Sequence, residues 1–288
     1  MSRLSRLACA VASIVLLVLP GTRAAWAQET SCSELVGKAC ETTDSAFADQ
    51  LSLKPSEPFS TSLHKKLTPG EQACSEVFNR AIYLQDFLQQ HKSAAHFDNC
   101  AFGEGADYIQ ELLVDADLRF KQPVMGSNRK LSDDFLAGLL SLGQVLHAIQ
   151  DFYAHSDFVE IQSRDTSISR LKDVVLPTMW NSQGRQTMET LVSQRGLRSG
   201  TWAIGGPKKC SVNAVAHEAL NKDSNKSIAG KVRIERWNRT QYEVAYELAR
   251  EASKRFLRDS AQRWPALKVC GGTLALMPLH ERRTEEKK

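Results

Sequence analysis

Apolar residues recur at helical spacing in four parts of the chain, and the first two lie before residue 121. Residues 68–71 (TPGE) combine a hydroxyl at the N-cap, a proline at the first helical position and a glutamate three residues after the cap, which is typical of a helix start. The apolar positions that follow predict a helix to about Gln90, and a second pattern predicts a helix from Glu104 to about Phe120. The inward-facing residues predicted for these two helices are Val77, Phe78, Ala81, Ile82, Leu88, Tyr108, Ile109, Leu112 and Leu113.

The third and fourth patterns also begin with helix-capping residues. Ser132 can cap a helix whose first turn contains Asp133 and Asp134, where the helix dipole favours negative charge, and this helix is predicted to end at about Ala154. Residues 240–243 (TQYE) form a capping box, and the helix that they open is predicted to end at Trp264-Pro265. Its apolar side is predicted to contain Tyr242, Ala245, Tyr246, Ala249, Ala252 and Phe256.

The region from 160 to 210 has a weaker pattern. Ile168 to Val175 predicts a short helix, and residues 191–206 (LVSQRGLRSGTWAIGG) predict a loop or a small hairpin. No internal repeat stands out. The sequence therefore predicts a mainly helical domain with long connections.

The first 27 residues have the pattern of a secretory signal peptide. Arg3 and Arg6 precede an apolar run to about Leu19, and small residues surround a predicted cleavage point after Ala27. After that point no stretch of about 18 apolar residues occurs, which predicts a mature chain without a transmembrane segment. We expect export to the periplasm or to the extracellular space.

The mature chain is predicted to contain one large domain between two shorter segments. Residues 28–63 are rich in Ser, Thr and Pro and form a cysteine-containing extension, 64–265 form the helical domain, and 266–288 form a charged tail. The signal segment contains three arginines and no acidic residue, so cleavage lowers the formal net charge from +4 to about +1. The mature chain therefore gives no strong nucleic-acid signal through bulk basicity.

The cysteine count also fits an exported protein. Six cysteines remain after cleavage, and an even number in an exported chain favours disulfides over thiolate metal ligands, although fifteen pairings are possible. The candidates are Cys32, Cys40, Cys74, Cys100, Cys210 and Cys270.

Ionisable residues interrupt the third helix at a regular spacing. His147, Asp151 and His155 are separated by four residues each, so they share one helix face among apolar neighbours. His147 and Asp151 can reach one metal ion, whereas His155 lies about 12 Å further along the axis and needs a bridging Asp151 to join them. The alternative is that both histidines form hydrogen bonds with Asp151 and bind no metal.

Further histidines and carboxylates lie on both sides of this helix. HFDN gives His96 and Asp98, with Asp86 ten residues before His96, and His64 precedes the first predicted helix. Taken alone, each has an ordinary interpretation as a capping or solvated residue. After the central helix come Glu160, His217 and Asp223, the last two in a stretch that would otherwise be interpreted as a polar loop.

HAIQDFYAHSDFVE, preceded by HFDN and followed by LNKDS, resembles the heterokaryon-incompatibility Het-C family. The typical run of that family is similar to H-T-I-Q-D-F-Y-S-H-S-N-W-V-E, with H-F-D before it and N-K-D after it. The resemblance spans about residues 64 to 260. It implies a distant relationship to zinc-dependent phospholipases C and fungal single-strand nucleases, which are all-helical enzymes with three zinc ions.

This resemblance implies a fold, a ligand set and a cofactor. The implied fold is a multi-helix bundle of the phospholipase C/nuclease type with long loops and disulfides, and the implied cofactor is Zn²⁺, with two or three ions. Asp86 and Asp151 would be catalytic, with Asp151 as the bridging carboxylate. The implied metal ligands are His64, Asp86, His96, His147, Asp151 and His155.

Two departures from the phospholipase pattern affect the third ion. The sequence lacks a second His-x-x-x-Glu pair, for which Glu160 or His217 with Asp223 are substitutes, and Asp98 is a further ligand or supporting residue. The phospholipases also use the amine of an N-terminal Trp, whereas Trp26 here precedes the predicted cleavage point.

We therefore expect a secreted metal-dependent phosphoric ester hydrolase, phospholipase C-like, that uses a zinc-activated water on a phosphodiester. Its expected substrate is a phospholipid or another phosphodiester, with peripheral membrane contact. Two alternatives remain open at this stage. One is a single-strand nuclease or nucleotidase on the same scaffold, and the other is a non-enzymatic Het-C-like recognition or toxin protein.

Overall fold

The computed structural model describes residues 73–127, 131–202, 210 and 214–270. This part of the chain is mainly helical, as predicted. Its elements are α6 (Ala73–Leu88), α7 (Ser93–His96), α8 (Phe102–Phe120), α9 (Asp133–His155), α10 (Phe158–Arg164), η1 (Leu171–Asp173), α11 (Gly184–Arg195), β1 (Gly200–Thr201), β2 (Val215–Ala216), α12 (His217–Leu220), β3 (Arg233–Ile234), η2 (Glu235–Trp237), β4 (Arg239–Thr240), α13 (Gln241–Arg263) and η3 (Pro265–Cys270).

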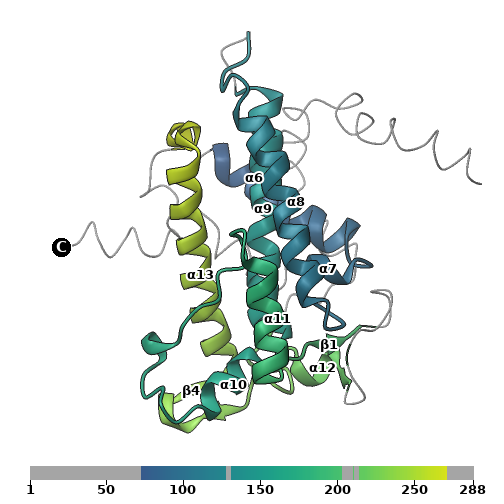
Figure 1. The fold of residues 1–288 in the computed structure, drawn as a ribbon, viewed down its shortest axis with the longest axis vertical. Helices are drawn as coiled ribbons and strands as arrows, with labels where there is room; N and C mark the ends of the chain where they lie inside the picture. Colours follow the sequence, from purple (N-terminus) through teal and green to yellow (C-terminus); the bar gives the residue numbers. More distant parts are fainter. Residues whose placement is uncertain (1–72, 128–130, 203–209, 211–213, 271–288) are drawn as a thin grey trace, which may run out of the picture.

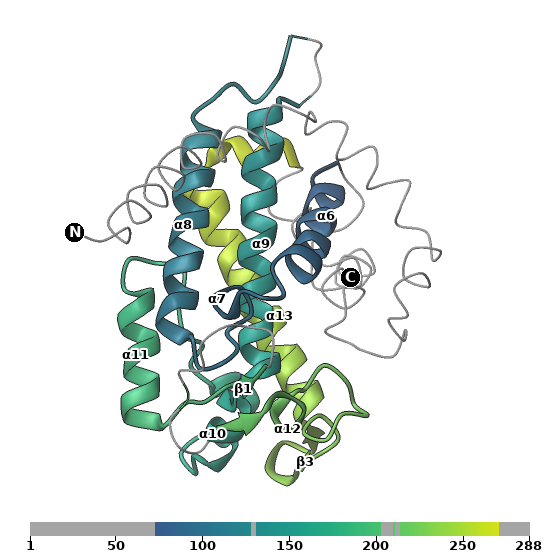
Figure 2. The same ribbon diagram turned by 90° about the vertical axis from the view of Figure 1, so that its right-hand side faces the viewer.

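Helix α9 is the centre of the fold. It packs against α6, α8 and α13, which surround it in both views (Figures 1 and 2). Its first turn forms as predicted, because the Ser132 hydroxyl accepts a hydrogen bond from the backbone N–H of Phe135. Every residue from 145 to 155 is buried, so this half of the helix contacts protein on all sides.

By length and composition, α9 is also the one helix among the described residues that could cross a membrane. However, 83% of its apolar window is buried inside the protein. A core helix passes the same test, so α9 is weak evidence for a membrane span.

The other three predicted helices form close to their expected positions. Helix α13 begins with the capping box, in which Thr240 and Glu243 exchange side-chain to backbone hydrogen bonds, and it ends one residue before Trp264. Helix α8 begins two residues earlier than predicted. Helix α6 is described from Ala73, so its predicted start at residues 68–71 lies outside the described residues.

Of two predictions for the region between α10 and α12, one is wrong and the other holds only in part. The helix expected from Ile168 to Val175 is only the three-residue 3₁₀ turn η1. The stretch 191–206 begins inside α11, which continues to Arg195 because Gly196 adopts the left-handed φ of 67° that ends a helix favourably. Residues 196–198 form a loop, as predicted, but β1 pairs in parallel with β2, so the alternative of a hairpin is wrong.

Two disulfides join segments that are far apart in the sequence. Cys74 on α6 is bonded to Cys270 in η3, and Cys100 is bonded to Cys210. The disulfide prediction is thus confirmed for these four cysteines, whereas Cys32 and Cys40 lie outside the described residues. The first bond connects the start of the described chain to its end, where Cys270 is buried beyond the predicted boundary at residue 265.

Candidate metal centres

The ionisable face of α9 is buried as a unit. His147 is 0% exposed, Asp151 is 2% exposed and His155 is 8% exposed. Burial of such groups is unfavourable unless other charges or hydrogen bonds compensate them. Two sets of side chains from other segments surround this face, and each contains histidine and aspartate.

The first cluster consists of Asp86 on α6, His96 at the end of α7, and His147 and Asp151 on α9. Asp151 Oδ2 lies 2.7 Å from His96 Nδ1 and 2.8 Å from His147 Nε2. His147 Nε2 lies 3.3 Å from His96 Nδ1 and 3.2 Å from Asp86 Oδ1. The structure therefore brings together four of the six residues that the resemblance implied as metal ligands.

The second cluster consists of Asp98 in the α7–α8 loop, His155 at the end of α9, His217 at the start of α12, and Asp223. Asp98 Oδ1 lies 3.5 Å from His155 Nδ1 and 3.7 Å from His217 Nε2. On its other side, His155 Nε2 lies 3.3 Å from Asp223 Oδ1. The sequence had suggested Asp98, His217 and Asp223 as further metal ligands or supporting residues, and the structure places all three around His155.

Each cluster contains atoms that could bind one ion together. Asp86, His96 and His147 offer ligand atoms that all lie within 4.8 Å of one another, and so do Asp98, His155 and His217. Neutral imidazole nitrogens and carboxylate oxygens are ligands that suit Zn²⁺. Ligands at about 2.1 Å in a tetrahedron are separated by about 3.4 Å, which is close to most of these distances.

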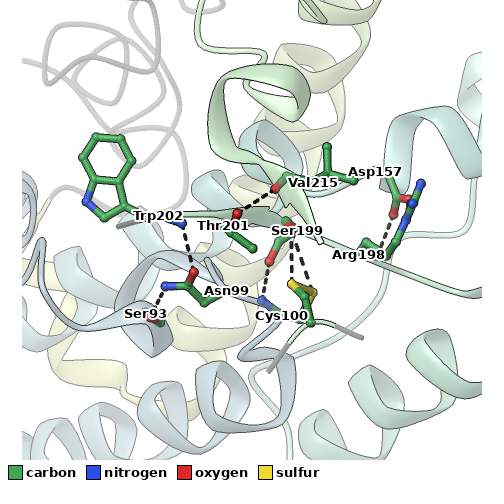
Figure 3. The surroundings of a disulfide bond; sticks show 10 residues. Ser93, Asn99, Cys100, Asp157, Arg198, Ser199, Thr201, Trp202 and Val215 are labelled. Carbon is green, nitrogen blue, oxygen red and sulfur yellow. Dashed lines mark hydrogen bonds and ion pairs between the residues drawn. A yellow bond between two sulfur atoms is a disulfide. The ribbon is translucent and has the colours of Figure 1, made fainter. Parts of the chain in front are cut away.

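The loop between α7 and α8 connects His96 of the first cluster to Asp98 of the second. Phe97, Asn99 and Cys100 all have positive φ, so the chain turns sharply between α7 and α8. Asn99 joins this turn to two other segments, since its side-chain amide donates to Ser93 Oγ in α7 at 2.8 Å and its side-chain carbonyl accepts from the Trp202 N–H, just after β1, at 2.9 Å (Figure 3). Asp98 is thereby directed to the second cluster, two residues after His96 enters the first.

The Cys100–Cys210 disulfide lies beside the second cluster. Ser199 accepts at its hydroxyl from the Cys100 N–H at 2.8 Å (Figure 3), so the Asp98 loop is fastened to the segment before β1. Strand β1 then approaches α12 closely. A Cβ at Gly200 would lie 2.5 Å from the His217 Cα, so only glycine allows this approach.

A buried lysine fixes the segment that follows His217. Lys222 is 0% exposed, and its Nζ donates to the carbonyls of Ser156 at 2.7 Å and Leu220 at 2.8 Å. The same ammonium forms an ion pair with Glu160 at 3.1 Å. Glu160 therefore compensates Lys222, and among the described residues it belongs to neither cluster, contrary to its suggested role as a late metal ligand.

The aspartates raise the pKa of one histidine in each cluster. Burial lowers the pKa of His96, but the hydrogen bond and charge of Asp151, together with Asp98 and Asp86, raise it above 6.5 overall. Burial likewise opposes the charges of Asp223, Asp151 and Asp98 at His155, and the sum raises the pKa of His155 well above 6.5.

The pKa values of two further residues in the second cluster, His217 and Asp223, are also shifted. Burial and the charge of His155 lower the pKa of His217. Burial raises the pKa of Asp223, but the charge and hydrogen bond of His155 outweigh it and lower that pKa overall. Asp151 and Asp98 act on histidines of both clusters, so the clusters are electrostatically coupled.

Some of the clustered atoms lack hydrogen bonds within the described part of the chain. These atoms are His96 Nε2, Asp98 Oδ1 and His155 Nδ1, and all three are buried. A buried polar atom without a partner costs about 1–3 kcal/mol, so such atoms are usually explained by a bound water or ion. The last two atoms face each other in the second cluster.

Two residues differ in how the sequence and the structure describe them. His64 lies outside the described residues. The buried cation Lys222 was not predicted, because nothing in the stretch LNKDS distinguishes a buried lysine from a solvated one.

These observations define a mainly helical protein with two buried histidine–aspartate clusters on one core helix. In comparisons with known families, the VWA7 N-terminal domain model matches residues 64–178. That match covers α6 to η1, which includes the whole first cluster and Asp98 and His155 of the second, but it ends before His217 and Asp223. No curated protein and no solved structure matches the chain.

The resemblance to the Het-C family is therefore wrong. The family model that matches is that of the VWA7 N-terminal domain, and neither a relative nor a solved structure supports a relationship to Het-C proteins or to phospholipases C. The mistake came from a fourteen-residue run on and after α9. Most of its positions are buried in the core or belong to the two clusters, so packing and charge compensation restrict the residues that can stand there.

Proposed function

We propose that this protein is a divalent-metal-dependent hydrolase of phosphoric esters, with the first cluster as its reaction centre. The proposal is supported chiefly by the unequal exposure of the cluster. The side chain of Asp86 is 33% exposed, whereas those of His96, His147 and Asp151 are 9% exposed or less. Solvent and substrate would reach the cluster at the Asp86 edge.

The donor set of the first cluster fits a divalent cation. Two imidazole nitrogens and two carboxylates are the ligand types of zinc sites, and His96 Nδ1, His147 Nε2 and Asp86 Oδ1 lie at spacings of 3.2–3.3 Å along that sequence of contacts. A zinc ion bound there would lower the pKa of a coordinated water and neutralise developing charge on phosphoryl oxygens. Asp86, at the exposed edge, would orient the attacking water and accept its proton.

Asp151 has a different role in this proposal. It is buried, and its Oδ2 contacts one nitrogen of each cluster histidine. Its charge also acts on His155 in the second cluster. Asp151 would therefore keep both imidazoles oriented and supply negative charge that also acts on the second cluster, a role that differs from the carboxylate bridge between two ions that the sequence suggested.

Among phosphoric esters we propose a phospholipid or a related small phosphodiester as the substrate. The mature chain has a formal net charge of about +1, obtained from +4 by removal of three arginines, so it lacks the basic excess that favours polymeric nucleic acid. Secretion, peripheral membrane contact and a fold of the phospholipase C/nuclease type also remain parts of this proposal.

One observation favours a nucleotide substrate as the second candidate. The half-buried ring of Trp202 lies 4.9 Å from the ring of His217, centroid to centroid, so an aromatic surface lies beside the second cluster. Such a surface could stack on a base. A third candidate, a non-enzymatic protein with structural metals, is favoured by the near-complete burial of seven of the eight clustered residues.

Hydrolysis assays separate these candidates. Purified full-length protein with zinc should cleave a chromogenic phosphocholine ester faster than single-stranded DNA, and His147→Ala should lower kcat/KM at least about 100-fold, since loss of a supporting residue alone costs 10- to 100-fold. The exposed His91 offers a matched control, and His91→Ala should retain activity. Faster cleavage of DNA would favour the second candidate, and no cleavage of either by zinc-loaded protein would favour the third.

A further inference from the structure

The second cluster differs from an ordinary hydrogen-bonded network. Asp98 Oδ1 and His155 Nδ1 are 3.5 Å apart, and Asp98 Oδ1 and His217 Nε2 are 3.7 Å apart. Both separations exceed the 2.7–3.2 Å of a good N–H···O bond. Accordingly, Asp98 Oδ1 and His155 Nδ1 make no hydrogen bond in the part of the chain that the structure describes.

These atoms are deeply buried and directed at one another. The side chain of Asp98 is 9% exposed, and those of His155 and His217 are 10% exposed. The rings of the two histidines lie 4.7 Å apart, centroid to centroid, so they approach Asp98 together. Three donors from three separate segments thus surround one small volume, at spacings close to the 3.4 Å expected between ligands of a tetrahedral zinc ion.

Asp223 approaches the cluster from the opposite side of His155. Its Oδ1 lies 3.3 Å from His155 Nε2, whereas the ring nitrogen that faces Asp98 is Nδ1. One ion cannot bind both nitrogens of the same ring. Metal-binding histidines commonly donate their other N–H to a carboxylate, which fixes the ring and its tautomer. Asp223 is in the position of that carboxylate.

We infer that Asp98, His155 and His217 bind a second zinc ion, with Asp223 as the positioning residue of His155. Zinc sites with three protein ligands keep a fourth position for water or substrate, so this centre is expected to be able to bind an exogenous anion or water. The inference does not depend on the hydrolysis proposed above, because it rests on atoms of the second cluster alone.

The segments that supply these ligands are independently restrained. The Asp98 loop is fastened by the Cys100–Cys210 disulfide and by the hydrogen bonds of Asn99, and Lys222 fastens the chain just before Asp223 to the end of α9. The donors are therefore positioned before a metal binds. Such preorganisation lowers the ordering cost of metal binding.

The test is the zinc content of the full-length protein after loading with zinc(II) and removal of excess metal. Wild type should contain two zinc ions per chain, and His217→Ala and Asp98→Asn should each retain only the ion of the first cluster. Glu218→Gln changes an exposed neighbour of His217 and should keep both ions. Two ions in His217→Ala would overturn the inference, as would a single wild-type ion that His147→Ala removes.

A second measurement uses a variant that leaves all three ligands in place. Asp223→Asn should still bind the second ion but about 10- to 100-fold more weakly, as is usual for loss of a carboxylate that supports a zinc histidine. Cobalt(II) bound to the wild-type second cluster should show the strong visible absorption of a four-coordinate site. An unchanged zinc affinity in folded Asp223→Asn would contradict its positioning role.

The two proposals can fail separately. Two zinc ions per chain without hydrolysis of either substrate would overturn the proposed function and leave the second site intact. Hydrolysis that His147→Ala abolishes, in a protein that binds one ion, would overturn the second site and leave the proposed function intact.

Discussion

The two clusters contain the same residue types, two histidines and two aspartates, but they compensate their burial differently. In the first cluster Asp151 Oδ2 lies 2.7 and 2.8 Å from two imidazole nitrogens, so hydrogen bonds can account for much of the arrangement. In the second, Asp98 Oδ1 faces two histidines at 3.5 and 3.7 Å. These distances are too long for good hydrogen bonds and suitable for a shared cation. The second cluster is therefore the stronger structural argument for a metal.

The clusters also differ in how their residues are supported. Helices α6, α7 and α9 position the first cluster, so it depends on core packing. The second cluster takes only His155 from a long helix, and its other members belong to a loop, to the short helix α12 and to the segment after it. Its geometry should therefore be more sensitive to the disulfide and to Lys222 than that of the first cluster.

The largest expected difference between the clusters concerns the pH dependence of zinc affinity. Below the raised pKa of His155, zinc must displace a proton, so affinity should fall about tenfold for each pH unit and about 100- to 1000-fold over two to three units. At the first cluster, where the pKa of His96 is raised less, the fall should begin at lower pH. Isothermal titration with zinc from pH 8 to 5 measures both, and a flat profile would contradict the assignment of these histidines as ligands.

In the zinc-free protein, a rise in pH should lower the free energy of unfolding, whereas in the zinc titration a rise in pH increases zinc affinity. A histidine with a raised pKa binds its proton more tightly in the folded state, so protonated His155 stabilises the fold below pH 6.5, and this contribution is lost as pH rises through its raised pKa. Urea unfolding of the metal-free protein should show the loss. A contribution from His155 that grows with pH, judged against His155→Gln, would count against this charge arrangement.

The next largest effect should come from Lys222→Met. This change removes a buried ammonium and leaves Glu160 without its ion pair, and breaking a buried pair typically costs about 3–5 kcal/mol. Because Asp223 is the adjacent residue, zinc affinity at the second cluster should fall while the first cluster is retained. Lys226→Met, at an exposed position, is the control. Equal unfolding free energies for the two variants would refute the role of Lys222.

Removal of the Cys100–Cys210 disulfide should have a smaller effect on stability and a selective effect on zinc. Cys100→Ser with Cys210→Ser is expected to lower the free energy of unfolding by about 2–4 kcal/mol and to weaken the second zinc site. The matched pair Cys74→Ser and Cys270→Ser should also lower stability but leave that site unchanged. Comparable loss of zinc in both pairs would show that the effect is general destabilisation.

The smallest expected effect is at the start of α13. Thr240→Ala removes the N-cap of the capping box and should cost about 1 kcal/mol in unfolding free energy, with zinc binding at both clusters unchanged. Thermal unfolding and zinc titration of the same sample measure both quantities. A change in the zinc affinity of Thr240→Ala would mean that zinc binding weakens with any loss of stability, wherever in the protein it occurs.

The sequence correctly predicted the helices that have both a capping signal and an apolar face. The capping residues at Ser132 and Thr240 define the starts of α9 and α13, and the four-residue spacing of His147 and Asp151 places them on one face. Spacing alone indicated only His147 and Asp151, whereas His96 and Asp86 were added by the resemblance to a family that does not match. By contrast, the short helix predicted from 168 did not form, because a weak apolar pattern does not decide between helix and turn.

The second cluster could not be assembled from the sequence because long-range contacts create it. Asp98 enters it only through the turn with positive φ at Phe97, Asn99 and Cys100, and His217 enters it through the close approach of β1 at Gly200. Neither feature has a periodic signal. The family was also misassigned, since a short run around α9 records the chemistry of one helix and not the connectivity of the chain.

We propose for both clusters that their buried histidines and aspartates bind divalent cations. Anomalous diffraction at the zinc absorption edge, from crystals of the zinc-loaded protein, tests it directly. The expected result is one peak among Asp86, His96 and His147 and another among Asp98, His155 and His217. Well-ordered clusters without a peak at either position would contradict the central claim.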